Sequence, residues 1–95
     1  MLLITMPEGP ATLIAAGGIY TPESGMVPIR DHVRVSNGHD YETDLGPGRY
    51  AYFFNAGGGV GRFKVAVTLQ NRPIASADFD TAAGTHALVV RFEVT

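Results

Sequence analysis

Twelve glycines and six prolines are spread along the 95 residues, and they interrupt every stretch that could form a long helix. Between these breaks, apolar and polar residues alternate with a period of two. The clearest run is Phe63, Val65, Val67 and Leu69, alternating with Lys64, Ala66, Thr68 and Gln70. Because strand side chains alternate between two faces, this run predicts a strand with one apolar face.

Six further segments show strand-like alternation or density of apolar residues. The expected strands cover residues 2–6, 11–20, 27–35, 49–55, 61–70, 73–80 and 86–94. The segment 11–20 is apolar on both faces, which predicts a central strand, and Gly17-Gly18 predicts a bulge in it. Val27 is expected on the apolar side of the third strand. The segment 73–80 is expected at a sheet edge because serine and aspartate occupy one of its faces.

Two short segments predict tight turns. Asn37-Gly38 lies between Val35 and Tyr41, a sequence that favours a type I′ hairpin. Asn71-Arg72 before Pro73 predicts a tight link after the strand at 61–70. The last four strands are expected to pair in order as a meander. Together these features predict one all-β domain over residues 1–95, an antiparallel two-sheet β-sandwich, immunoglobulin-like or related, with a small β-barrel as the alternative.

The segment 45–50, Leu-Gly-Pro-Gly-Arg-Tyr, is typical of a tyrosine corner. In that device, a tyrosine that opens a strand sends its hydroxyl back to the backbone a few residues upstream. Tyr50 is expected in this role, with Gly48 permitting the sharp corner. The segment resembles the Pro-Gly-x-Tyr turn of many immunoglobulin-like accessory modules, over about six of the 95 residues. It departs from their pattern because three strands follow it.

Composition excludes several classes of function. The net charge is −2 and the basic residues form no stripe, so nucleic-acid binding is not expected. Cysteine is absent, which excludes disulfides and thiol nucleophiles. No apolar run is long enough for a membrane span, and no secretory signal is visible, so the cytoplasm is the default expectation.

Catalytic motifs are also missing. The serines at 24, 36 and 76 do not lie in a Gly-x-Ser-x-Gly elbow, and a chain of this length encloses a deep cleft with difficulty. No enzymatic activity and no cofactor are therefore expected.

Only 17% of the residues are charged, below the usual quarter. A surface so poor in charge favours coverage by another chain. The first hypothesis is therefore a non-catalytic structural or protein-interaction module, self-associating, whose partner is itself or another protein chain. An exposed aromatic among Tyr20, Tyr41 and Tyr52 is expected to contribute to the contact.

Two alternatives from other classes stay open. A small-ligand or carbohydrate-binding module would use Tyr41 beside Asp40 and Glu42, and Asn55 and Gly58 of the glycine-rich loop.

A metal-binding protein would instead use imidazole and carboxylate ligands around the Asn37-Gly38 hairpin, where His32 and His39 would face each other beside Asp40.

Overall fold

The computed structural model describes residues 1–83 and 88–95, and these contain eight strands and one 3₁₀ turn. The strands are β1 (Leu2–Glu8), β2 (Ile14–Tyr20), β3 (Arg30–Ser36), β4 (Tyr41–Thr43), β5 (Gly48–Gly57), β6 (Arg62–Leu69), β7 (Arg72–Asp80) and β8 (Leu88–Val94). The 3₁₀ turn η1 covers Thr81–Ala83. Among the described residues, no helix has the length and apolarity of a membrane span.

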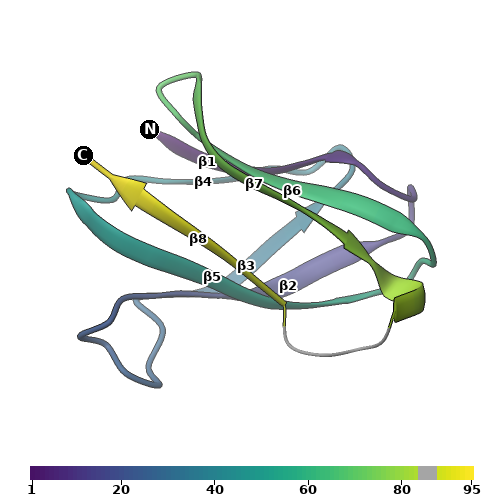
Figure 1. The fold of residues 1–95 in the computed structure, drawn as a ribbon, viewed down its shortest axis with the longest axis horizontal. Helices are drawn as coiled ribbons and strands as arrows, with labels where there is room; N and C mark the ends of the chain where they lie inside the picture. The colour runs from purple at the N-terminus through teal and green to yellow at the C-terminus, as the bar shows by residue number, and fades with distance from the viewer. Residues whose placement is uncertain (84–87) are drawn as a thin grey trace.

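The strands form two antiparallel sheets that pack face to face (Figure 1). One sheet has the order β4-β1-β6-β7 and is called sheet A below; the other has the order β3-β2-β5-β8 and is called sheet B. The predicted two-sheet sandwich is confirmed, and the barrel alternative is wrong because the sheets do not close on each other.

The core fills the space between the two sheets and is built from alternate residues of six strands and the residue preceding β2. Its members are Leu2, Ile4, Met6, Leu13, Ala15, Ile19, Val33, Val35, Tyr52, Phe54, Phe63, Val65, Val67, Val90, Phe92 and Val94. In β6 the residues at 63, 65 and 67 are buried and those between them are partly exposed, which confirms the predicted alternation.

The hairpin between β6 and β7 has a two-residue turn formed by Gln70 and Asn71. Leu69 pairs with Arg72, and the two turn residues have φ angles of 51° and 66°. Two successive positive φ angles define a type I′ turn, whose twist matches that of the strands it joins. The predicted tight link is thus present, one residue earlier than Asn71-Arg72. Pro73 lies beside a register shift in β7.

The predicted meander of the last four strands is wrong. Only β6 and β7 pair with each other, whereas β5 pairs with β2 and β8 in sheet B. Five of the seven connections between successive strands cross from one sheet to the other, those after β1, β3, β4, β5 and β7. The crossings place successive strands on opposite sides of the core, where their apolar faces meet between the two sheets.

The Asn37-Gly38 turn exists but does not form the predicted hairpin. Ser36 and His39 exchange two backbone hydrogen bonds of 3.0 Å around it. Gly38 has a φ of 99°, and Asn37 is not among the described residues with positive φ, so the turn is not type I′. After His39 the chain leaves sheet B, and β4 pairs with β1 in sheet A.

The central position of β2 and its bulge are confirmed. Strand β2 lies between β3 and β5, and its register with β3 shifts between Gly17 and Ile19. The prediction for Val27 is wrong, since Val27 lies outside β3 and is 69% exposed. It belongs to the loop between β2 and β3, which extends away from the sandwich at the lower left of Figure 1. The predicted last strand begins two residues before β8, and residues 86 and 87 lie outside the described residues.

Candidate interaction surface

The residues that the sequence analysis proposed for ligand binding do not come together in one place. Asp40 and Glu42 are exposed beside or within β4, and the half-buried Tyr41 pairs with Ile4 in sheet A. Asn55 lies on β5 in sheet B. Gly58 follows β5 with a φ of 86°, and its α-carbon lies against the backbone of Thr12, where a Cβ would come within 2.6 Å of the carbonyl oxygen.

The proposed metal ligands are also apart. His39 is opposite Ser36, whereas His32 lies in the β3 bulge with a φ of 55°. The His32 backbone N–H donates a 2.8 Å hydrogen bond to Asp31 Oδ1. Residues 1–83 and 88–95 contain no group of three or more histidine, aspartate or glutamate side chains that could share a metal ion. The geometry therefore does not favour the metal hypothesis.

The corner around Tyr50 has the geometry expected from the sequence. The Tyr50 hydroxyl donates a 2.6 Å hydrogen bond to the Gly46 carbonyl oxygen, four residues upstream. The Tyr50 ring stacks on Phe92 of β8 with ring centroids 5.5 Å apart. Gly48 has a φ of 154°, a conformation that residues with a Cβ rarely adopt. The corner therefore fixes the start of β5 against β8.

The outer face of sheet B forms an aromatic surface that no sequence motif had indicated. Tyr20 of β2 and Phe53 of β5 make an edge-to-face contact there, with ring centroids 5.5 Å apart and planes at 83°. Phe53 remains 39% exposed. Gly18 and Val89 are the direct neighbours of Phe53 on the adjacent strands. Three aromatic residues were expected to be exposed, and for Tyr52 this prediction is wrong, because Tyr52 is fully buried in the core.

A groove of about 680 Å³ begins at this aromatic pair. Its wall includes Tyr20, Phe53 and Ala51, the loop after β2, and charged residues from β5 and β8. Arg49 Nε lies 3.8 Å from Glu93 Oε2, so these two side chains form an exposed ion pair at the rim. The groove thus combines an apolar floor with a charged border.

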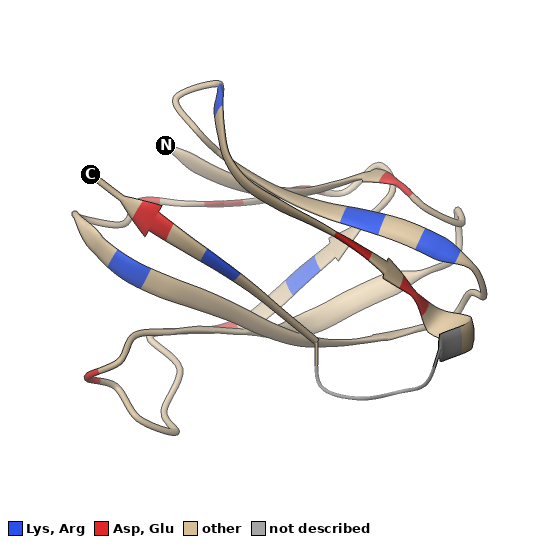
Figure 2. Cartoon of the chain, in the orientation of Figure 1, with Lys and Arg blue, Asp and Glu red and all other residues tan. Residues whose placement is uncertain are grey.

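The outer face of sheet A is different in character. Arg62 pairs with Asp80 and Lys64 with Asp78, at 3.8 Å and 3.9 Å, from neighbouring strands. Charged positions recur along β6 and β7 in Figure 2, whereas β2, at the centre of sheet B, has none. The outer face of sheet A therefore carries two ion pairs between β6 and β7, whereas the charges of sheet B lie on the strands around an uncharged, aromatic and small-residue centre.

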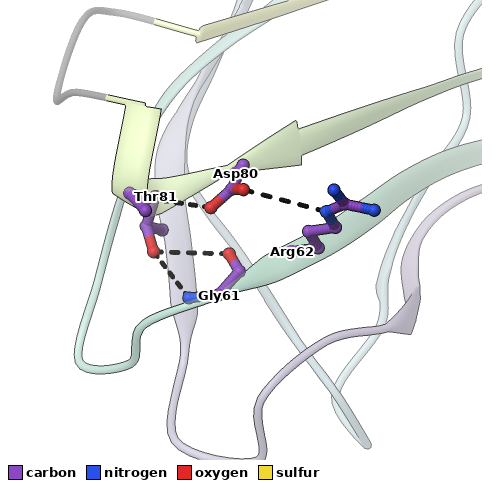
Figure 3. Close-up of polar contacts among 5 residues, drawn as sticks. Gly61, Arg62, Asp80 and Thr81 are labelled. Atoms are coloured by element: carbon purple, nitrogen blue, oxygen red, sulfur yellow. Dashed lines mark hydrogen bonds and ion pairs between the residues drawn. The ribbon is translucent and has the colours of Figure 1, made fainter.

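A second polar cluster closes the end of sheet A and is shown in Figure 3. The Gly61 N–H donates a 2.8 Å hydrogen bond to Thr81 Oγ1, and the Thr81 N–H donates a 3.1 Å bond to the Gly61 carbonyl oxygen. Asp80 accepts a 2.9 Å hydrogen bond from the Ala82 N–H and also pairs with Arg62. These groups bind one another, so the cluster connects the start of β6 to the end of β7 and has a structural role.

The free edges of the two sheets differ in how well they are protected. An edge strand offers unpaired backbone groups to other chains, and proteins limit this with short strands, bulges, proline or charged side chains. In the described part of the chain, β4 has three residues, β3 has the bulge at Asp31-His32, and β7 has Pro73 with a register shift. Strand β8 is seven residues long, has no bulge or proline, and keeps a continuous register with β5 from Leu88 to Val94, with Arg91 and Glu93 as its charged residues.

Comparisons with protein-family models, with curated proteins and with solved structures found no match for this chain.

The signals for the missed surface were present in the sequence. Phe53 is out of phase with the buried Tyr52 and Phe54, which places it on the opposite face of its strand. Finding Tyr20 beside it required the pairing of β2 with β5, two strands that are separated in the sequence by β3 and β4. No local pattern contains that pairing.

Proposed function

We propose that this chain is a non-catalytic protein-interaction module that associates with copies of itself through sheet B. The observation that carries the proposal is the regular edge of β8, which no bulge, proline or shortening interrupts. This strand is seven residues long, regular and free of proline and glycine. Such an edge is a template for pairing with another strand.

The surroundings of β8 support the same proposal. Val90, Phe92 and Val94 point into the core, so the strand is held rigidly in an extended form. Its outward-facing neighbours on β5 are Phe53, Ala51 and Arg49, and Arg49 pairs with Glu93 of β8. A partner strand added at this edge would extend an existing sheet without reorganising the core.

The test is the solution mass measured by light scattering over a wide range of protein concentration, combined with amide hydrogen exchange. We expect a dimer whose population rises with concentration. Amides of β8 should become protected as it forms, while amides of β4, the control edge, should exchange at an unchanged rate. A monomer at every concentration would contradict self-association.

A second candidate function is small-ligand or carbohydrate binding, and the groove at Tyr20 and Phe53 favours it. Exposed aromatic rings with nearby arginine and carboxylate groups suit stacking and hydrogen bonding to a sugar. Screening soluble glycans at high protein concentration tests this candidate, and Phe53→Ser should abolish any binding found. An array without a hit would count against it.

A further inference from the structure

Strand β8 carries two opposite charges on its outer face, Arg91 and Glu93, separated by one inward-facing residue. Both are exposed. We infer that β8 pairs antiparallel with β8 of a second copy around a two-fold axis at Phe92, so that Arg91 lies opposite the second copy's Glu93 and Glu93 opposite its Arg91. The inference rests on the self-association proposed above and specifies its partner, symmetry and register.

The charges select this register among the neighbouring ones. In an antiparallel pair of identical strands, the residue on the two-fold axis lies opposite itself. An axis at Arg91 would place arginine opposite arginine, and an axis at Glu93 would place glutamate opposite glutamate. An axis at Phe92 makes both charged pairs complementary. Directly opposed charges of unlike sign stabilise a sheet and like charges destabilise it.

The apolar side of the strand fits the same axis. With Phe92 opposite itself, Val90 lies opposite the second copy's Val94, and both residues point towards the core side of the sheet. All inner-facing residues stay on one side and all outer-facing residues on the other, as a continuous sheet requires.

The resulting assembly joins two four-stranded sheets into one of eight strands, β3-β2-β5-β8 followed by the same strands of the second copy in reverse. The Tyr20–Phe53 surfaces of both copies then lie on the same side of this sheet. Within each copy, Arg49 Nε stays 3.8 Å from Glu93 Oε2. Each Glu93 therefore lies between Arg49 of its own chain and Arg91 of the second copy.

Charge reversal tests the pairing. Arg91→Glu leaves two glutamates on the strand and Glu93→Arg leaves two arginines, so each single variant should dimerise at least about tenfold more weakly than the native chain. Mixing the two variants should restore a heterodimer, and the double variant Arg91→Glu/Glu93→Arg should restore a homodimer. Arg62→Glu, the same substitution on sheet A, is the matched control and should leave the dimer unchanged. Circular dichroism of each variant checks that the sandwich is folded.

Cysteine cross-linking then determines the register, because the native chain has no cysteine. Residues directly opposite in a sheet are close enough for a disulfide. A mixture of Arg91→Cys and Glu93→Cys chains should oxidise to a mixed disulfide dimer, while neither variant alone should cross-link efficiently. A disulfide formed by Arg91→Cys alone, or by Glu93→Cys alone, would place the axis elsewhere and overturn the register.

The outcomes separate the inference from the proposal it rests on. A native dimer that neither single charge reversal weakens would overturn pairing through β8 and leave self-association standing. A native chain that stays monomeric at every concentration would overturn both.

Discussion

The Tyr52 hydroxyl donates a 2.9 Å hydrogen bond to the Val33 carbonyl oxygen and thereby connects β5 to β3 across the intervening strand β2. The phenol is fully buried, and its ring stacks on Phe54 with centroids 4.7 Å apart. A buried polar group without a partner destabilises a fold, so this single bond makes the burial of a tyrosine at the centre of the core acceptable.

We predict that Tyr52→Phe lowers the free energy of unfolding by about 1–2 kcal/mol, because the buried hydrogen bond to the Val33 carbonyl oxygen is lost while the ring packing is kept. Urea denaturation at neutral pH measures the change. Tyr50→Phe, which removes the exposed bond to Gly46, is the control and should cost less. Equal losses in the two variants would contradict a special contribution from the buried bond.

The same phenol makes stability depend on alkaline pH. Burial raises the pKa of Tyr52 above its ordinary value of 10.0. Below pH 10 the phenol is neutral in both states, and its stabilising effect is fully present. Above pH 10 the unfolded chain loses the proton first, so the free energy of unfolding falls by up to about 1.4 kcal/mol per pH unit. Denaturation curves at several alkaline pH values should show a steeper loss for the native chain than for Tyr52→Phe. Parallel losses would contradict the raised pKa.

Gly17 is required by the close approach of β2 and β5. A Cβ at this position would lie 2.6 Å from Phe54 Cα and still closer to the Phe53 carbonyl oxygen. We predict that Gly17→Ala destabilises the fold by more than about 2 kcal/mol, since backbone must move to admit the methyl group. The control is Gly57→Ala at the end of β5, where a Cβ meets no atom within 4 Å. Thermal unfolding of both variants compares them, and a small effect at Gly17 would contradict the steric argument.

The turn at Gln70-Asn71 can be made more stable by substitution. Both residues adopt positive φ, which costs energy for residues with a side chain, and Asn-Gly is the favoured type I′ pair. We predict that Gln70→Asn/Asn71→Gly raises the free energy of unfolding by about 1 kcal/mol. Asn37→Gly, in the turn that is not type I′, should give no gain. A gain at position 37 that matches the gain at 70–71 would show that positive φ is not its cause.

The parts of the fold predicted from sequence are those set by neighbouring residues. The alternation from Phe63 to Leu69, the bulge at Gly17-Gly18 and the corner at Tyr50 each depend on a few consecutive positions. Strand pairing does not, because the inner face of β5 would satisfy the same apolar pattern beside β6 or beside β2. The prediction of a meander was therefore wrong, because closeness in the sequence favoured β6 as the neighbour of β5, whereas the fold pairs β5 with β2 and β8.

The prediction of a type I′ hairpin at Asn37-Gly38 was wrong for a related reason. Asn-Gly is a type I′ signal when it joins two strands that pair with each other, and here β3 does not pair with β4, because the chain crosses to sheet A after His39. The candidate surface could not be predicted for the same reason, because Tyr20 and Phe53 meet only through the pairing of two distant segments. The sequence of β8 predicts a regular strand, because its residues alternate and include no glycine or proline. Its position at the edge of sheet B depends on the pairing of distant strands and could not be predicted in this way.

The repeated crossing between sheets has a consequence for how the chain reaches this structure. Strand β1 needs both β4 and β6 as neighbours, and β5 needs β8, so neither sheet can be completed from one continuous stretch. A chain emerging from the ribosome would have to wait for its last strand before the second sheet is complete. Such nonlocal topologies fold slowly, over milliseconds to seconds, and any cut in the middle should leave two fragments that are unfolded on their own.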